Sequence, residues 1–348
     1  MIVTVTLNPS LDRTIELEDR LLRGQVQRAA RITQQPGGKG VNVSRALHAA
    51  GVDTLAILPG APTDPMIVAL QADGIPAANL AVPGPVRSNT TITEPDGTTT
   101  KINEAGSALD EEEADALIRL IVEHARSASW LVLAGSLPPG VPDDLYARIV
   151  RTVRADRAAG EQLGERIGES LGESLGEPLR IAVDTSGAPL AALVASGETV
   201  DVIKPNAEEL VELAEALGVL PSEPIGDPDL LTVDDERLAR LADAVLSPAL
   251  GAVLVTLGAE GAALFERDDV HTAPAPVIVA RSTVGAGDCS LAGYLLAAES
   301  GEGAAGRLAL AIAYGAAAAS LPGSTVPTPD LTRPEAIHIT RRSRVRSP

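Results

Sequence analysis

Short apolar runs alternate with segments of helical period along almost the whole chain. The apolar runs, which we interpret as short buried strands, are residues 2–7, 54–58, 130–133, 181–183, 200–203 and 253–256. Helical spacing of apolar residues is found between them, at about residues 39–50, 64–73, 110–126, 142–155, 187–196, 206–217, 234–246, 286–299 and 304–319. Strands that alternate with helices in this way form a mostly parallel sheet with helices on both faces. We therefore predict an α/β sandwich.

Residues 12–36 and 87–104 break this alternation. Both segments are rich in Thr, Ile and Val and lack a helical period, and Asp96-Gly97 in the second is a strong hairpin signal. We interpret both as strands of a small sheet that covers a site or pairs with a second subunit. Because the exposed face of such a sheet needs a cover, we expect a homodimer through it. The α/β body then consists of residues 1–11, 37–86 and 105–330.

Two further segments lie outside the body and the small sheet. Residues 160–179 repeat Leu-Gly-Glu or Ile-Gly-Glu every four residues. Each of these glycines costs a helix about 1 kcal/mol relative to alanine, so we expect a loose, partly helical surface insert. Residues 331–348 form a C-terminal tail, whose arginine-rich end, 341–348, is expected to be disordered.

The net charge and the cysteine content limit the kinds of partner and the cellular compartment that we expect. The chain has 348 residues and a formal net charge of −19, which argues against nucleic acid as a partner. The single cysteine, Cys289, excludes an internal disulfide and fits a reducing compartment. We find no basic leader before the first apolar run and no apolar run long enough to span a bilayer. We therefore predict a cytoplasmic protein with no membrane partner.

The sequence Thr283-Val-Gly-Ala-Gly-Asp288 opens one of the predicted helices. A helix N-terminus presents unpaired N–H groups and the positive end of the helix dipole, so it binds anions. Gly285 and Gly287 let the backbone approach such an anion closely. Asp288, just inside the first turn, is placed to take a proton from an attacking hydroxyl. An anion cradle beside a base is what phosphoryl transfer requires.

A second glycine-rich helix start, Gly37-Gly-Lys-Gly-Val-Asn-Val, lies near the N-terminus. Lys39 can meet an anionic group and Asn42 can hydrogen-bond a polyol. The alternative is a plain glycine-rich helix start with an exposed lysine. Neither glycine motif is a P-loop, which needs Gly-x4-Gly-Lys-[Ser/Thr], or a dinucleotide fingerprint, which needs a glycine where Ser290 stands. Two anion sites suit a reaction between two phosphorylated ligands.

Polar or glycine residues also follow several predicted strands, including Asp12, Ser136, Asn206 and Gly258. In one parallel sheet these positions share the edge where open α/β sheets bind ligands. The alternatives are local: Asp12 is also a common turn residue. Asn206 with Glu209, three residues later, forms a helix capping box or reaches a hydrated Mg²⁺.

These motifs together resemble the PfkB family of ribokinase-like carbohydrate kinases. Residues 283–288 look like the C-terminal signature of the family and residues 37–43 look like its N-terminal signature. The resemblance runs from residue 2 to about residue 329, without the insert. It implies a ribokinase-like three-layer αβα sandwich in which the small sheet is a β-lid. It is strongest to the 1-phosphofructokinase and tagatose-6-phosphate kinase subgroup, in the stretches 6–12, 101–104, 135–140 and 203–210.

The resemblance implies an ATP- and Mg²⁺-dependent kinase that phosphorylates a hexose phosphate. D-fructose 1-phosphate is the first expectation for the acceptor, and tagatose 6-phosphate and fructose 6-phosphate are the alternatives. A nucleoside or ribose kinase fits less well, because Lys39, Arg87 and Lys101 are too basic for a neutral sugar. The alternative of another class is a ligand-binding regulator on a kinase scaffold, since a fold does not fix a function.

The resemblance also implies a role for each matched residue. Asp288 would be the general base. The anion hole for the migrating phosphoryl group would be made by the N–H groups of Gly285, Ala286 and Gly287. The sugar phosphate would be bound by Asp12, Gly38, Lys39, Asn42, Arg87, Lys101, Asn103, Ser136 and Arg28. The nucleotide would be bordered by Lys204, Asn206, Thr256, Gly258, Gly261, Gly285 and Gly287. Mg²⁺ would be organised, through water, by Asn206 and Glu209.

Two features depart from the family pattern. Cys289 follows Asp288, where Ser or Ala is commoner. A thiol at a helix N-terminus can have a lowered pKa, and the alternative is a small buried side chain without reactivity. The family offers no role for the insert at 160–179.

Overall fold

The computed structural model describes residues 1–167, 178–220 and 225–343, and its centre is one large sheet. In order across the sheet the strands are β14 (Thr340–Ser343), β13 (Asp269–Ala273), β12 (Ala262–Glu266), β11 (Ala252–Thr256), β10 (Val202–Ile203), β9 (Arg180–Asp184), β8 (Trp130–Ala134), β1 (Ile2–Val5), β4 (Thr54–Pro59) and β5 (Ala77–Leu80). Neighbours from β11 to β5 are parallel, and β11 to β14 form an antiparallel edge. The predicted mostly parallel sheet is confirmed.

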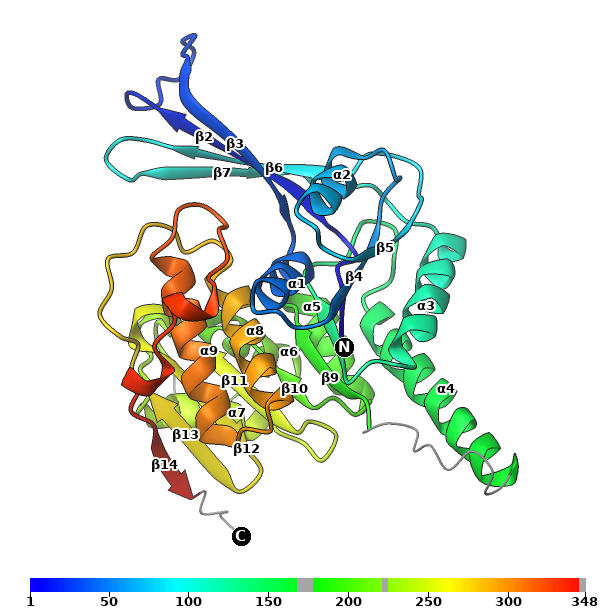
Figure 1. Ribbon diagram of the computed structural model, residues 1–348. Coiled ribbons are helices and arrows are strands. Elements are labelled where there is room, and N and C mark those ends of the chain that lie inside the picture. The colour runs from blue at the N-terminus through cyan, green and yellow to red at the C-terminus, as the bar shows by residue number, and fades with distance from the viewer. Residues whose placement is uncertain (168–177, 221–224, 344–348) are drawn as a thin grey trace.

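Helices cover both faces of this sheet (Figure 1). One layer consists of α3 (Glu111–Ala125), α4 (Leu145–Ile167), α5 (Gly187–Ser196), α6 (Ala207–Ala216) and α7 (Glu236–Val245). The opposite layer consists of α1 (Lys39–Ala49), α8 (Ala286–Glu299) and α9 (Ala304–Ala319), and the short α2 (Pro65–Ala72) packs beside α1. Each of the predicted helices is present. The three-layer αβα sandwich is therefore confirmed.

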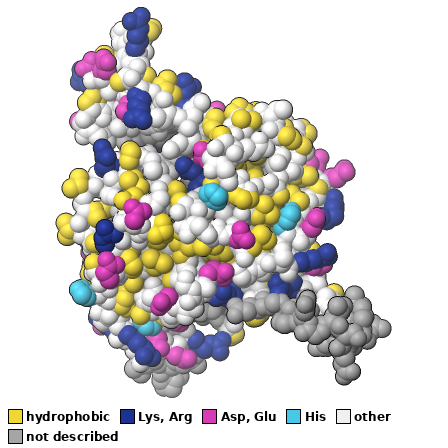
Figure 2. Space-filling view, viewed as in Figure 1, with side chains coloured by type: hydrophobic (Ala, Val, Ile, Leu, Met, Phe, Trp, Pro, Cys, Tyr) yellow, Lys and Arg dark blue, Asp and Glu magenta, His cyan; other side chains and the backbone are white. Residues whose placement is uncertain are grey.

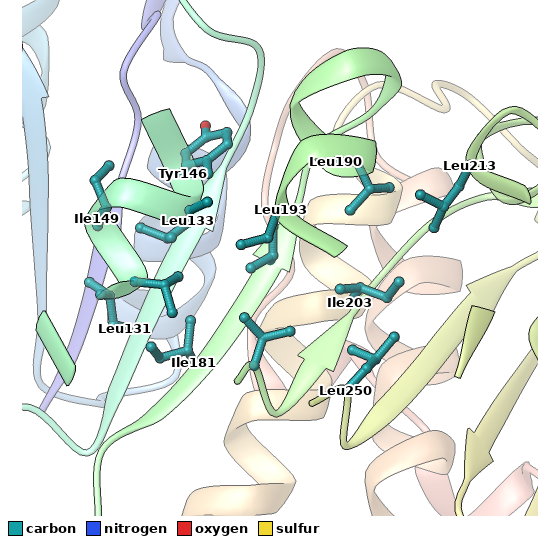
Figure 3. Close-up of a cluster of buried hydrophobic side chains, with 14 of the residues drawn as sticks. Leu131, Leu133, Tyr146, Ile149, Ile181, Leu190, Leu193, Ile203, Leu213 and Leu250 are labelled. Carbon is teal, nitrogen blue, oxygen red and sulfur yellow. The ribbon is translucent and has the colours of Figure 1, made fainter. Parts of the chain in front are cut away.

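The strands alternate between two aliphatic cores. In β8, Leu131 and Leu133 belong to the core under α3 to α7, whereas Trp130 and Val132 belong to the core under α1, α8 and α9. This period of two is that of a strand buried on both faces. Figure 3 shows part of the first core, to which Leu193 of α5 and the strand residues Leu131, Leu133 and Ile181 contribute. Helices on both faces leave ligands access only at the ends of the strands.

A second sheet of four strands stands above the body (Figures 1 and 2), and we call it the lid. Its order is β3 (Ala29–Gly37), β2 (Ser10–Leu17), β6 (Arg87–Thr93) and β7 (Thr99–Asn103). The predicted hairpin at Asp96-Gly97 joins β6 to β7, and Gly97 has a φ of 90° that favours glycine. The small separate sheet expected from the sequence is present.

Some strands and one helix end differ from the sequence prediction. Strands β5, β12 and β13 were not expected, and α4 continues past residue 155 to Ile167. The expectation of disorder from residue 341 onward is wrong for residues 341–343, which belong to β14. Arg341 and Arg342 pair there with Asp269 and Asp234, both at 2.8 Å, so acidic partners order the arginines. Residues 168–177 of the insert and 344–348 of the tail lie outside the described residues.

Within residues 1–167, 178–220 and 225–343, no helix combines the length and the apolar character that crossing a membrane requires.

Candidate active site

The carboxyl ends of β1, β8, β9, β10 and β11 meet at one edge of the central sheet, below the lid (Figure 1). Backbone bonds join the segments that leave these ends. Gly135 N–H donates to Asp184 O at 2.9 Å, and an isolated bridge pairs Asn206 with Thr256. The helices α1 and α8 begin at the same edge. The polar segments that follow separate strands in the sequence therefore lie together.

Asp288 lies in the first turn of α8 and is buried. Gly285 caps the helix with a φ of 77°, in the left-handed region where glycine is favoured. Asn42 Nδ2 donates a hydrogen bond to Asp288 Oδ2 at 2.8 Å, and this bond joins the two glycine-rich helix starts. Burial, helped by the charge of Asp184, raises the pKa of Asp288 to about 6. A carboxylate of this kind accepts protons near neutral pH.

Lys204 lies beside the start of α8. A Cβ at position 287 would lie 3.3 Å from Lys204 Nζ, so the ammonium group touches the glycine-rich turn. Its side chain is buried, and Nζ is 3.0 Å from Asp184 Oδ2. An ammonium group and a helix N-terminus both attract an anion, so this point can hold a phosphoryl group.

Asp184, at the end of β9, holds two lysines toward this edge. Lys39 Nζ lies 2.8 Å from Asp184 Oδ1 and 3.5 Å from Glu209 Oε1. Burial opposes ionisation of the fully buried Asp184, but Lys204 and Lys39 outweigh it and hold its pKa below the ordinary value. Burial lowers the pKa of Lys39, but the negative charges of Asp184 and Glu209 outweigh burial and raise this pKa above its ordinary value. Lys39 therefore stays charged at neutral pH.

The glycines at the start of α1 serve packing. A Cβ at Gly38 would lie 2.8 Å from Thr6 Cγ2, and one at Gly40 would lie 2.8 Å from the carbonyl oxygen of Val5. Side chains at these positions would push α1 away from β1. Gly38 also has a φ of 107°, which favours glycine. These glycines let the helix start, and with it Lys39 and Asn42, approach the strand ends.

The lid contributes a polar row at its base. The strand registers place Gln35, Asp12, Asn89 and Asn103 side by side across the four strands, and therefore on one face. Asp12 Oδ1 accepts from Ser10 Oγ at 2.7 Å and from Asn89 Nδ2 at 3.3 Å. Burial raises the pKa of Asp12. This row can receive the hydroxyls of a polyol.

Three of the basic residues predicted to bind the sugar phosphate lie at different distances from the base of the lid. Arg87 lies at its base, on the face of Asp12, and donates to the carbonyl of Glu104 at 3.1 Å. Lys101 shares that face but lies further out on β7 and is exposed. Arg28 precedes β3, seven residues from Gln35, which is about 20 Å along a strand. The structure therefore places Arg28 away from the row at the base of the lid.

Comparison with protein families identifies this architecture. The model of the pfkB family of carbohydrate kinases matches residues 5–160 and 172–331, which is most of the chain. The chain belongs to the pfkB carbohydrate kinase family. It is 31% identical over 300 residues to a 1-phosphofructokinase of Xanthomonas campestris, with 85% of this chain and 83% of that protein covered. It is 32% identical over 330 residues to a 1-phosphofructokinase of Haloferax volcanii, with 94% and 93% covered.

Solved structures agree with this assignment. Phosphofructokinase-2 from Escherichia coli, solved in complex with potassium, has a TM-score of 0.79 and 25% identity, and the match covers 95% of this chain and 96% of that one. The same enzyme in its tetrameric inhibited form has a TM-score of 0.76 and 25% identity, with 93% and 95% covered. Members of the family are carbohydrate kinases, so the chain is a phosphotransferase, and the family implies ATP as donor.

The residues expected at the nucleotide side of this pfkB kinase occupy the ends of β10 and β11. Thr256 ends β11, and Gly258 opens a short 3-10 helix, where an added Cβ would meet no atom within 4 Å. Gly261 has a φ of 108°, and a Cβ there would collide with the backbone of Ala273 and Pro274. Gly261 therefore allows β12 to pack closely on the segment after β13, which is a structural reason for a glycine at this position.

Asn206 and Glu209 form a complete capping box at the start of α6. Glu209 N–H donates to Asn206 Oδ1 at 2.8 Å, and Asn206 N–H donates to Glu209 Oε2 at 2.9 Å. The other oxygen, Oε1, faces Lys39. The described residues contain no group of three or more His, Cys, Asp or Glu side chains placed around one point. This donor set fits a hydrated Mg²⁺ that takes its remaining ligands from water and phosphate.

Four residues of this edge were missed by the sequence analysis. Asp184 had a signal, because an acidic residue ends the apolar run 181–183 at the ligand edge. Asn8 donates to Ser136 Oγ at 3.3 Å and to the carbonyl of Ala105 at 3.0 Å. Tyr146 Oη and Thr185 Oγ1 both donate to the carbonyl of Gly135, at 2.9 Å. These contacts hold the loop that follows β8 in place, and no local sequence pattern predicts them.

The structure decides between the two interpretations of the Cys289 thiol. This thiol is buried in the core under α8, and burial, with the neighbouring Asp288, raises its pKa. The lowered pKa considered for a thiol at a helix N-terminus is wrong here, because desolvation outweighs the helix dipole. Cys289 is a small buried side chain.

Proposed function

We propose that this pfkB kinase is a 1-phosphofructokinase, which converts D-fructose 1-phosphate and ATP to D-fructose 1,6-bisphosphate and ADP. Two relatives that match over most of the chain, at 31% and 32% identity, carry that name. The observation that supports the chemistry best is the start of α8, where Asp288 follows Gly287 and Lys204 Nζ lies beside Gly287. A base and a cationic anion site meet there, which is the arrangement that phosphoryl transfer uses.

The proposed reaction is an in-line displacement at the γ-phosphorus. The free hydroxyl on C6 of the sugar phosphate attacks, its proton passes to Asp288, an O–P bond forms, and the bond from phosphorus to the bridging β,γ-oxygen breaks as ADP leaves. The N–H groups of Gly285, Ala286 and Gly287, with Lys204, stabilise the charge on the phosphoryl oxygens. Asp288, with a pKa of about 6, is mostly ionised at pH 7 and can accept the proton.

We assign the sugar phosphate to the space between the start of α1 and the base of the lid. Asp12, Asn42 and Asn103 would bind hydroxyls, together with the backbone at Gly38. Lys39, Arg87, Lys101 and Ser136 would bind the phosphate group already on the sugar. Arg28, which precedes β3, lies about 20 Å along the strand from Gln35, so we place it outside this site within one copy of the chain.

ATP is assigned to the side of the edge formed by Lys204, Asn206 and the segment 256–261. Mg²⁺ would be held, through water, by Glu209 and Asn206, and when bound it would neutralise charge on the phosphate oxygens. The capping box leaves Glu209 Oε1 facing Lys39, so a bound cation would compete with Lys39 for that oxygen.

The identity of the sugar phosphate that accepts the phosphoryl group can be decided by comparing the reaction rates of three sugar phosphates. ADP release should be followed with D-fructose 1-phosphate, fructose 6-phosphate and tagatose 6-phosphate, and kcat/KM compared. The proposal expects the highest value for D-fructose 1-phosphate. A preference for either 6-phosphate would assign the chain to that alternative activity of the same family, and ATP consumption with none of the phosphorylated hexoses would overturn the hexose-phosphate assignment. A ligand-binding regulator would consume no ATP.

We further propose that two copies pair through the lid. The face of the lid opposite Asp12 carries Ile15, Ile32 and Ile92 in one row across three strands, and Ile102 on the fourth. Ile32 is 49% exposed and Ile102 is 57% exposed. A covered apolar row would explain these side chains. The expected result is a dimer by light scattering and a monomer for Ile32→Glu; a wild-type monomer would contradict the pairing.

A further inference from the structure

Arg45 is a buried arginine of α1, and none of the proposed contacts with phosphate groups involves it. Only 8% of the residue is exposed, although arginine is rarely buried without a specific partner. It follows Asn42 by three residues, so the two side chains lie on the same face of the helix. Its Nη1 donates to Asn42 Oδ1 at 3.3 Å, to the carbonyl of Ser324 at 3.1 Å and to the carbonyl of Pro36 at 3.3 Å.

These contacts fix which end of the Asn42 amide faces Asp288. A guanidinium group has donors only, so the atom of Asn42 that faces Arg45 must be the oxygen. The NH2 group then points to Asp288, where Nδ2 donates to Oδ2 at 2.8 Å. In the reversed amide, the oxygen would face the carboxylate and the NH2 group would face the guanidinium, and both contacts would be repulsive.

We propose that Arg45 is a positioning residue, which locks the Asn42 amide so that it donates to Asp288 and keeps this carboxylate able to accept a proton at neutral pH. The inference deepens the proposed function and rests on the assignment of Asp288 as the general base. Arg45 itself touches neither Asp288 nor the phosphoryl site.

The surroundings of Asp288 make this one hydrogen bond important. Burial and the carboxylate of Asp184, from β9, favour the protonated form, and the hydrogen bond from Asn42 is the largest of the effects that oppose them. Lys204, after β10, and Lys39, of α1, also favour the charged form, and the neighbouring Cys289 is neutral. Loss of a hydrogen bond to a charged group raises a carboxyl pKa by about one unit or more.

The same guanidinium also reaches the lid. Pro36 lies at the end of β3, and Ser324, which accepts from Arg45 through its carbonyl, donates from Oγ to Gln35 Oε1 at 2.8 Å. Gln35 lies opposite Asp12 in the lid. Arg45 therefore joins the end of the lid, the segment around Ser324 and the amide that faces the base. A purely structural role would hold these segments together without acting on the base.

The test is the pH dependence of kcat/KM for the sugar phosphate in wild type, Arg45→Met and Arg45→Lys. We expect Arg45→Met to move the acid limb up by about one pH unit, which costs about five-fold at pH 6 and little at pH 9. Arg45→Lys, which retains donors only, should restore most of the profile. The acid dissociation of the sugar phosphate is the same for every variant, so a difference between variants belongs to the protein.

The matched control is Arg154→Met. Arg154, on α4, also tethers backbone, donating to the carbonyls of Leu179 at 2.7 Å and Thr199 at 3.3 Å, but it does so away from the site. Its loss should lower Tm and leave the acid limb in place. If Arg45→Met does not fold, Arg45→Gln replaces it. A glutamine amide can present either end to Asn42, so it no longer fixes the orientation, and an intermediate shift is expected.

Three outcomes separate the claims. A loss of rate in Arg45→Met that is equal at every pH, or an unchanged profile, would overturn the positioning role. An acid limb in Asp288→Asn that is as large as the limb of wild type would instead overturn the assignment of the base, because the sugar phosphate alone accounts for only the part that both proteins share. The shift expected from Arg45→Met should also vanish in an Asn42→Ala background, because the amide that transmits it is then absent.

Discussion

The two glycine-rich helix starts of this kinase look alike in sequence and differ in what their glycines do. At the start of α1, a Cβ at Gly38 or Gly40 would meet Thr6 or the backbone of β1 within 2.8 Å, so the glycines allow close packing. At the start of α8, a Cβ at Gly287 would meet only the end of Lys204, at 3.3 Å. The glycines of α1 are needed by the fold, and Gly287 leaves room for a ligand.

The difference shows that a glycine motif has to be interpreted through its neighbours. The α1 start delivers side chains, because its packed glycines bring Lys39 and Asn42 to the strand ends. The α8 start delivers its backbone and Asp288. One hydrogen bond, from Asn42 to Asp288, connects them. We therefore expect substitutions of the α1 glycines and Lys39 to affect stability and sugar binding, and substitutions of Gly287 and Asp288 to affect chemistry.

The largest effect is expected for Asp288→Asn. Loss of a general base typically lowers kcat by about 10²–10⁴-fold, and ATP binding should remain. Stability should change in the opposite direction. Burial raises the pKa of Asp288 from 3.8 to about 6, so the folded protein is stabilised at low pH and loses that stability as the pH rises through this window. Asn does not ionise, so Tm at pH 7 should rise. A kcat near that of wild type would refute the assignment.

Replacing each lysine by methionine should separate the two starts. A charged hydrogen bond to phosphate contributes about 1.5–3 kcal/mol, which corresponds to roughly 10- to 150-fold. Lys204→Met should lower kcat and weaken ATP binding, while the KM for the sugar phosphate changes little. Lys39→Met should mainly raise the KM for the sugar phosphate. Equal effects of both variants on both substrates would show that the two helix starts do not serve different ligands.

The smallest effects, in opposite directions, are expected from Gly40→Ala and Gly287→Ala. The new Cβ at position 40 meets Thr6 and a backbone carbonyl, so unfolding free energy should fall by about 1–3 kcal/mol. At position 287 alanine favours the helix by up to about 1 kcal/mol but displaces Lys204 and narrows the anion site. Chemical denaturation should therefore show a loss of stability for Gly40→Ala, and kinetics should show a loss of kcat for Gly287→Ala. A destabilised Gly287→Ala would contradict the comparison.

The sequence predicts the body well because its signals are local. Apolar runs and helical period place the helices and the parallel strands, and Asp96-Gly97 places the lid hairpin. The antiparallel edge was missed. In β14, for example, the arginines pair with strand β13 and with acidic side chains about 70 to 110 residues away in the sequence. A sequence also does not show how far out on the lid a residue such as Arg28 lies.

The site was predicted in part for the same reason. Residues inside motifs, such as Asp288 and Lys39, stand out by type and spacing. Asp184 and Arg45 act through partners that lie far away in the chain: Asp184 pairs with Lys39, 145 residues earlier, and Arg45 contacts Ser324, 279 residues later. Single residues of this kind become visible only once the sheet edge is assembled.

The most direct test of the account is the pH profile of kcat/KM in wild type and Asp288→Asn. With the pKa of Asp288 at about 6, the base is lost as the pH falls, so wild-type kcat/KM should drop about ten-fold between pH 7 and pH 5 beyond any change that Asp288→Asn also shows. The limb that Asp288→Asn retains reports the sugar phosphate alone. Parallel profiles for the two proteins would contradict the claim that Asp288, held by Asn42 at the start of α8, is the base.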